Sequence, residues 1–158
     1  MYTPVNEGVD HINIYSKSGT ELGRLLSNFS KSPFKHPSFG QFMSVEGFWY
    51  WLSTGCKHDE LKQLWGNKAK LHGRNLPKVK IDNFDSIITE AIELKVRNSD
   101  VLKSMLITNE LPLAHYYYFG SIDNCKIVAP AGGEWLIDIF NNLKVKFKGE
   151  QNGTSSSS

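Results

Sequence analysis

The sequence lacks the features of a membrane-spanning or secreted protein. It has no hydrophobic run near the roughly 20 residues that span a bilayer. Its first residues, MYTPVNEGVDHINIY, show no basic region followed by an apolar one, as a secretory signal would. It has only two cysteines, Cys56 and Cys125, which follow no metal-ligand spacing. We therefore expect a cytoplasmic protein with reduced thiols and no contact with a membrane.

The sequence also lacks the common motifs of cofactor and metal sites. It contains no glycine-rich phosphate loop of the Walker or dinucleotide type, no paired metal-ligand histidines and no nucleophile elbow. The five histidines are scattered along the chain, and each by itself is more typical of a surface or structural role than of a ligand or base. We therefore expect neither a cofactor nor a metal ion.

Charge and aromatic content restrict the kinds of partner. Eighteen basic and sixteen acidic residues give a formal charge of +2, too little for a broad basic face on duplex nucleic acid. This balance still allows a small local patch that receives phosphates. Aromatic residues make up 12% of the chain, enough for stacking surfaces in addition to a core.

The pattern of apolar residues predicts one helix-rich α+β domain with a small sheet over residues 1–148, followed by a disordered tail over 149–158. A chain of 158 residues fits one domain. Strands are expected at 9–15, 113–120 and 125–130, the last two joined by a turn at 121–124. Helices are expected at 44–55, 59–72, 82–98, from 99 through 106, and 134–144.

The segment SVEGFWYWLSTG, residues 44–55, carries one carboxylate, Glu46, directly before a run of large residues. Ser44 is a suitable N-cap, and an acid in the first turn is favoured by the helix dipole, which is the simpler interpretation. The same geometry can lower the pKa of Glu46 and keep it ionised in an aromatic cleft, where it accepts a hydrogen bond from a ribose hydroxyl or a water. The next large residues, Trp49, Tyr50 and Trp51, point about 100° apart around a helix, so at least one must face a groove or solvent.

Gly73 and Arg74 follow the expected end of a helix. A glycine allows close backbone approach and a guanidinium binds phosphate or pyrophosphate, so the pair suits a phosphate group. The alternative is an ordinary C-terminal glycine beside a solvated arginine, which the local sequence favours.

The order of these features resembles the NADAR superfamily, also called YbiA-like. The resemblance rests on Ser27-Asn28-Phe29, on Ser44 and Glu46 at a helix start, on Gly73-Arg74, on a long helix with Phe84 near its start, and on the later ITNELPLAHYYYFG. It covers roughly residues 12 to 143. The family comprises small α+β domains linked to NAD and ADP-ribose metabolism. The short form here is similar to versions carried by bacteriophages.

The resemblance implies an N-glycosidase, since family enzymes cleave N-glycosidic bonds in riboflavin-synthesis intermediates or between ADP-ribose and guanine. It makes Glu46 the catalytic carboxylate, places Asn28 and Phe29 at the ribose end, and places Gly73-Arg74 at the phosphate side. Trp49, His115 and Tyr117 are further candidate ligand-binding residues. A fixed carboxylate suits this reaction because positive charge develops at the anomeric carbon.

The sequence departs from the family pattern at two positions of the glutamate helix. Family enzymes place a histidine after the glutamate and a lysine farther along, where this chain has Gly47 and Ser53. The family's Trp-Gly element has its nearest match in Phe119-Gly120. Side chains of 115–117 could rebuild part of the site, and Asp123 or Glu134 could supply a second acid.

Three hypotheses follow. The first is a NADAR-like N-glycosidase that acts on an ADP-ribosyl or related ribosyl-base substrate and reverses ADP-ribosylation in a phage-infected cell. The second is a non-catalytic protein that binds or sequesters an NAD-derived nucleotide. The third is a phage accessory protein whose aromatics form an interaction surface. Nucleic acid is expected only as an ADP-ribosylated substrate, and the oligomeric state is left open.

Overall fold

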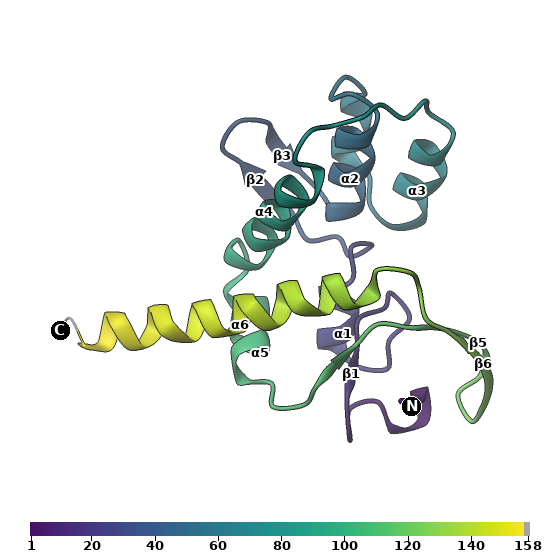
Figure 1. The fold of residues 1–158 in the computed structure, drawn as a ribbon, viewed down its shortest axis with the longest axis vertical. Helices are drawn as coiled ribbons and strands as arrows, with labels where there is room; N and C mark the ends of the chain where they lie inside the picture. Colours follow the sequence, from purple (N-terminus) through teal and green to yellow (C-terminus); the bar gives the residue numbers. More distant parts are fainter. Residues whose placement is uncertain (157–158) are drawn as a thin grey trace. The chain divides into compact units, whose positions relative to one another are not determined.

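The structure is a computed structural model that describes residues 1–156. The chain forms two compact units, whose elements are labelled in Figure 1. The central unit consists of Asn28–Asp100. The terminal unit combines Met1–Ser27 with the chain from Val101 onward.

The central unit contains one β-hairpin and three α-helices (Figure 1). Phe34 of the first strand lies opposite Phe42 of the second, in an antiparallel pair. The elements are, in order, β2 (Phe34–His36), β3 (Gly40–Phe42), α2 (Val45–Ser53), the 3-10 helix η2 (Asp59–Gln63), α3 (Gly66–Arg74) and α4 (Phe84–Arg97).

Aromatic rings form the core of this unit. Phe34, Phe42 and Phe48 are fully buried. The Phe34 and Phe42 rings stack with centroids 5.7 Å apart, and the Phe48 ring meets Phe42 edge-on at 4.8 Å. The buried Trp51 indole donates a 2.9 Å hydrogen bond to Asp59, which ties α2 to η2. The β2–β3 hairpin and α2 are thus fixed to each other by ring packing.

His36 joins the hairpin to α4. Its Nδ1 accepts hydrogen bonds from the backbone amides of Ser38 and Phe39, so the ring proton is on Nε2. Nε2 lies 2.7 Å from a carboxylate oxygen of Glu90. The ring also stacks on Phe39 with centroids 4.5 Å apart. The buried imidazole therefore has a structural role.

The terminal unit contains short strands and three α-helices. Ile12 pairs with Leu113 in a parallel ladder, and Tyr117 pairs with Val128 in an antiparallel hairpin. The elements are η1 (Pro4–Asn6), β1 (Ile12–Asn13), α1 (Glu21–Leu26), α5 (Asp100–Thr108), β4 (Leu113–Ala114), β5 (Tyr117–Ser121), β6 (Asn124–Val128) and α6 (Gly133–Ser156).

A carboxylate organises the loop before α1. Glu7 accepts hydrogen bonds from the backbone amides of Asn13 at 2.9 Å and Gly19 at 2.8 Å. It also accepts from the hydroxyls of Thr20, at 2.7 Å, and Ser18. Four donors on one carboxylate hold the loop without regular secondary structure.

The predicted α+β class is confirmed, whereas several element predictions need correction. The small sheet consists of three separate two-stranded pairs, and the strand expected at 9–15 is regular only over Ile12–Asn13. The helix expected at 59–72 is broken because Trp65 is extended and Gly66 has a φ of +59°. The helix α1 was not predicted, while the hairpin around 121–124 is confirmed.

The last helix, α6, continues past Gly149, where the sequence predicts a disordered tail to begin. Ser157 and Ser158 lie outside the described residues. Within residues 1–156, none of the helices combines the length and the apolar character needed to cross a membrane.

Candidate active site

Ser44, and not Glu46, caps α2. The Ser44 hydroxyl accepts a 2.9 Å hydrogen bond from the Gly47 amide and donates to the Leu64 carbonyl at 2.8 Å. The amide of Glu46 donates to the carbonyl of Asn28 at 3.0 Å. The first turn of α2 is thus held by its cap and by the segment at Asn28, and the Glu46 carboxyl is not needed for capping.

Burial determines the charge of Glu46. Loss of solvent raises the pKa of the Glu46 carboxyl to about 7, and the nearby Lys70 ammonium opposes this rise. The prediction of a lowered pKa is therefore wrong: desolvation outweighs the favourable helix dipole. Near neutral pH the carboxyl is divided between its protonated and ionised forms, as suits a group that donates or accepts a proton.

Close packing of α3 on α2 brings basic groups to this carboxyl. Gly73 is buried so tightly against Tyr50 that an added Cβ would lie 2.2 Å from Tyr50 Cγ. One turn of each helix separates Glu46 from Tyr50 and Lys70 from Arg74. Lys70 acts electrostatically on Glu46, and Arg74 acts on Tyr50. An acid, a phenol, an amine and a guanidinium therefore gather along the α2–α3 edge.

Tyr50 remains a neutral hydrogen-bond donor in this setting. Burial, followed by the Glu46 carboxylate, raises the pKa of its phenol, and Arg74 opposes the rise. The ammonium of Lys78 lies 5.4 Å from the centroid of the Tyr50 ring. Lys78 also donates to the Gly73 and Leu76 carbonyls, each at 2.8 Å. Three cationic side chains thus follow the edge that starts at Glu46.

Asn28 offers a hydrogen-bond acceptor. Its side-chain oxygen is buried without a hydrogen-bond partner among the described residues. Such an atom costs about 1–3 kcal/mol unless a donor reaches it. The backbone carbonyl of Asn28 is a separate acceptor, which receives the Glu46 amide, so the side-chain oxygen is left for another donor. Phe29, the next residue, is half-buried, and its carbonyl lies near Gly66 at the start of α3.

Gly47, at the position where NADAR-family enzymes have histidine, packs closely against the backbone of η2. A Cβ at position 47 would lie 2.5 Å from the Leu61 carbonyl oxygen and 3.0 Å from that of Leu64. No larger side chain fits there. At the other departure, the Ser53 hydroxyl donates to Tyr50 O at 3.4 Å. The amine near Glu46 comes instead from Lys70, on a different helix.

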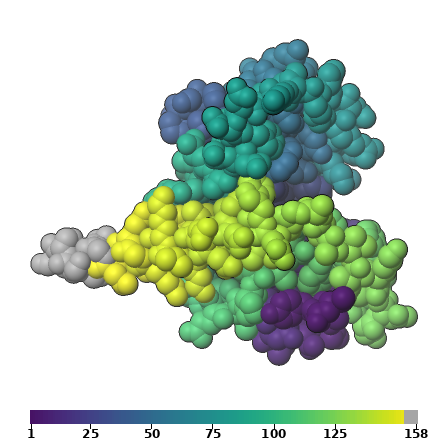
Figure 2. Space-filling view, viewed as in Figure 1, coloured from purple at the N-terminus to yellow at the C-terminus, as the bar shows by residue number. Residues whose placement is uncertain are grey.

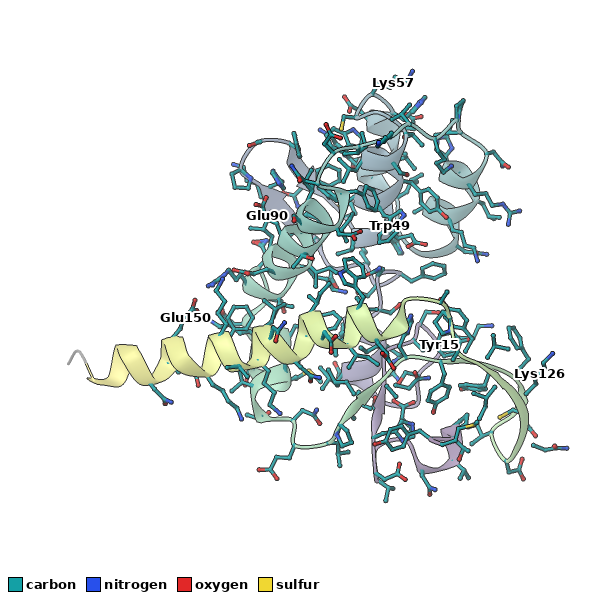
Figure 3. All side chains as sticks on the ribbon, viewed as in Figure 1. Tyr15, Trp49, Lys57, Glu90, Lys126 and Glu150 are labelled. Atoms are coloured by element: carbon teal, nitrogen blue, oxygen red, sulfur yellow. The ribbon has the colours of Figure 1, made fainter. Side chains whose placement is uncertain are left out.

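The other predicted residues of the central unit occupy different positions. Trp49, labelled in Figure 3, packs edge-on against Phe84 of α4 with centroids 5.0 Å apart. Gly73 and Arg74 lie within the last turn of α3, not after its end, so that expectation is wrong. Tyr50 and Lys70 were not among the predicted site residues. A signal for both was available, because Gly73 marks close helix packing and each residue lies within one turn of a selected residue.

His115 and Tyr117 belong to the terminal unit. His115 Nδ1 lies 2.6 Å from the Ile14 carbonyl and therefore carries the proton there. Burial lowers the pKa of its imidazole, and this hydrogen bond opposes the effect. The Tyr117 ring lies edge-on to His115 at 5.6 Å and tilted to Tyr15 at 5.4 Å. Their participation in one site with Glu46 stays a prediction.

The chemistry available in the central unit is acid–base chemistry beside a positively charged edge. In the described residues, no group of three or more His, Cys, Asp or Glu side chains could hold a metal ion. The Glu46 carboxyl supplies a proton donor or acceptor near pH 7. Lys70, Arg74 and Lys78 supply the positive charge along this edge.

Comparison with known proteins identifies the fold. No family model matches the chain, and no curated protein matches it. The chain is similar to the NMR structure of the Escherichia coli protein YbiA, with a TM-score of 0.66 and 18% sequence identity. The likeness covers 96% of this chain and 89% of YbiA. A YbiA-like fold is therefore established, and because the likeness spans nearly the whole chain, the predicted single α+β domain is confirmed.

Proposed function

We propose that the protein is a NADAR-type N-glycosidase that cleaves the bond between a ribose and a nitrogenous base in an ADP-ribosyl or related ribosyl substrate. The observation that carries the proposal is the Glu46 carboxyl, which is partly buried, has its pKa raised by loss of solvent to about 7 and interacts electrostatically with the Lys70 ammonium. The YbiA-like fold supports it.

The protonated Glu46 acts as a general acid. It gives its proton to the leaving base as the bond from the anomeric carbon to nitrogen breaks and the bonding electrons pass to that nitrogen. The resulting carboxylate then stabilises the positive charge on the sugar and orients the attacking water, which adds to the anomeric carbon and loses a proton to the carboxylate. A pKa of about 7 allows both roles in one turnover.

The surrounding groups bind the rest of the substrate. Lys70 and Arg74 attract a diphosphate, and the unpaired Asn28 oxygen accepts a ribose hydroxyl. The ring of Tyr50 provides a surface next to these cations. In this proposal the substrate is a nucleotide or an ADP-ribosyl adduct, and the setting is a bacterial cytoplasm, with reversal of ADP-ribosylation during phage infection as the cellular role.

The test is product formation with a matched pair of variants. The wild-type protein is incubated with NAD, ADP-ribose adducts of guanine nucleotides and riboflavin-pathway ribosylamines, and released bases are resolved by chromatography. Glu46→Gln should lose at least about 100-fold in rate, because acid–base catalysis contributes that much or more. Glu21→Gln, at the exposed first turn of α1, should retain wild-type activity. Equal rates for Glu46→Gln and wild type would overturn the proposal.

A second candidate is a binding protein of the same fold, favoured by the absence of the family histidine and lysine on α2. Position 47 has no room for a side chain, and position 53 is a serine. In that case, ADP-ribose would raise the melting temperature of both wild type and Glu46→Gln, and neither would release a product. Thermal shift combined with chromatography separates the two candidates.

A further inference from the structure

The positive charge of this chain is concentrated in one segment. Residues 61–81 contain six lysine or arginine residues and no aspartate or glutamate. This leaves twelve basic and sixteen acidic residues, a net charge of −4, for the rest of the chain. The small overall charge of +2 therefore conceals a local excess of positive charge on α3 and the segment after it. The six residues are Lys62, Lys68, Lys70, Arg74, Lys78 and Lys80.

Most of this charge is available at the surface of the central unit. Five of the six side chains are exposed, all except Lys62. The helix itself packs through its small residues Ala69 and Gly73, which are buried, so the longer basic side chains project outward. The surface of the central unit is drawn in blue to teal in Figure 2.

An exposed aromatic ring begins the same helix. Trp65, the N-cap residue of α3, keeps 39% of its surface exposed. The ammonium of Lys31 lies 4.5 Å from the centroid of the Trp65 indole. A flat ring with a cation over one face is the arrangement that stacks nucleobases while the cation attracts phosphate. The Trp65 ring and the basic segment together define what we call the α3 basic face: Lys31, Trp65, and the exposed basic residues Lys68, Lys70, Arg74, Lys78 and Lys80.

We propose that the α3 basic face binds the backbone of single-stranded nucleic acid, with Trp65 as a stacking surface for a base. The lysines and arginine neutralise successive phosphates, and the indole contacts a base that is unstacked in a single strand. Four residues of this face were not assigned above to the edge at Glu46: the cations Lys31, Lys68 and Lys80, and the aromatic Trp65. The inference shares Lys70, Arg74 and Lys78 with the proposed glycosidase site but requires no bond cleavage, so it can be tested separately.

Other polyanions fit this face less well. A membrane-surface helix needs a broad apolar side, but on α3 Leu71 is the one large aliphatic residue that is exposed. An acidic protein segment would use the cations and leave the Trp65–Lys31 pair without a role. A single strand supplies both phosphates and flat rings. We therefore assign nucleic acid as the partner.

The test is the salt dependence of binding to fluorescein-labelled oligothymidylate, measured by anisotropy. Each phosphate contact contributes about −0.7 to the slope of log affinity against log salt. The double variant Lys68→Gln/Lys80→Gln should therefore reduce the magnitude of the slope by about 1.4. The control Lys35→Gln/Lys126→Gln removes two exposed lysines elsewhere and the same net charge, and should leave the slope unchanged.

Trp65→Leu should weaken binding about fivefold or more at every salt concentration without changing the slope, because stacking is lost and no phosphate contact is removed. Circular dichroism of each variant checks that the fold is kept. Since oligothymidylate carries no ADP-ribosyl group, the result does not depend on turnover.

Three results would overturn the inference. They are no binding at low salt, equal slope changes in the two lysine pairs, and binding of polyglutamate or phosphatidylserine vesicles as tight as that of the oligonucleotide. Product release from a small nucleotide substrate together with any of these results would retain the glycosidase and remove the nucleic-acid face.

Discussion

The backbone of Gly73 lies directly against the ring of Tyr50, leaving no space for a side chain at position 73. A Cβ there would lie 2.2 Å from Cγ and 2.5 Å from Cβ of Tyr50. This contact sets how closely α3 approaches α2. Because Lys70 and Arg74 lie on the same helix as Gly73, the contact also brings Lys70 within electrostatic range of Glu46 and Arg74 within range of Tyr50.

Gly73→Ala should therefore destabilise the protein. Either Tyr50 or α3 must move, and such overpacking typically costs 1–3 kcal/mol, more than the helix propensity of alanine returns. Urea unfolding measures the loss. Gly149→Ala is the matched control in α6, where nothing lies within 4 Å of the added Cβ, and it should be neutral or stabilising by up to about 1 kcal/mol. A Gly73→Ala protein as stable as wild type would contradict the close contact between Gly73 and the Tyr50 ring.

The Glu46 carboxyl should make the protein less stable as the pH rises. Its pKa is about 7 in the folded protein against an ordinary value of 4.5, so the folded state holds this proton where the unfolded chain has lost it. This contribution is fully present below about pH 4.5 and is lost as the pH rises through about 7.

Glu46→Gln removes this titration and should stabilise the protein at pH 8 by at most about 3 kcal/mol relative to wild type. The difference should nearly vanish at pH 4. Denaturant unfolding at the two pH values measures it, and Glu21→Gln on the exposed surface should show little difference at either. A glutamine variant that is less stable than wild type at pH 8 would contradict a desolvated carboxylate.

Lys70→Gln should shift the pH dependence of the proposed reaction. Lys70 favours the ionised form of Glu46, so its removal raises the pKa of that carboxyl further. If Glu46 must be protonated to act, kcat/KM falls above about pH 7 in wild type, and this fall should move to higher pH in Lys70→Gln. Lys68→Gln, two residues away on α3, should keep the wild-type profile. A shift to lower pH would show that Lys70 does not favour the ionised form of Glu46.

Restoring the family histidine should fail. Gly47→His places a large side chain where even a Cβ would lie 2.5 Å from a backbone carbonyl, so we expect a loss of several kcal/mol or no folded protein. Thermal unfolding and the yield of soluble protein report the result. Ser53→Lys, at a partly exposed position, should be tolerated. A stable and more active Gly47→His protein would show that η2 can move away from α2.

Several features were predictable from the sequence because they depend on local interactions. The wide apolar stripe of 82–98 and the Ser44 cap predicted α4 and α2 within two residues of their observed ends. The hairpin at 117–128 followed from two β-rich runs around a polar turn. The fold class followed from the pattern of apolar residues, and the catalytic role expected of Glu46 came from the order of motifs along the chain.

The sequence did not predict the charge of Glu46 or the groups beside it. Burial is a property of the packed chain, and here it reversed the direction of the expected pKa shift. The break at Trp65 and Gly66 depends on a backbone conformation that the apolar pattern of 59–72 does not reveal.

By itself, the sequence determined an α+β chain with a capped helix that presents one acid, and a segment of uniform positive charge. Only the tertiary structure decided that α3 packs on α2 through Gly73, which places Lys70 near Glu46 and excludes a side chain at position 47. The physical reason is that helix caps and apolar stripes arise from residues a few positions apart. Charge interactions and close helix packing arise between residues about twenty or more positions apart, such as Glu46 with Lys70 and Tyr50 with Gly73.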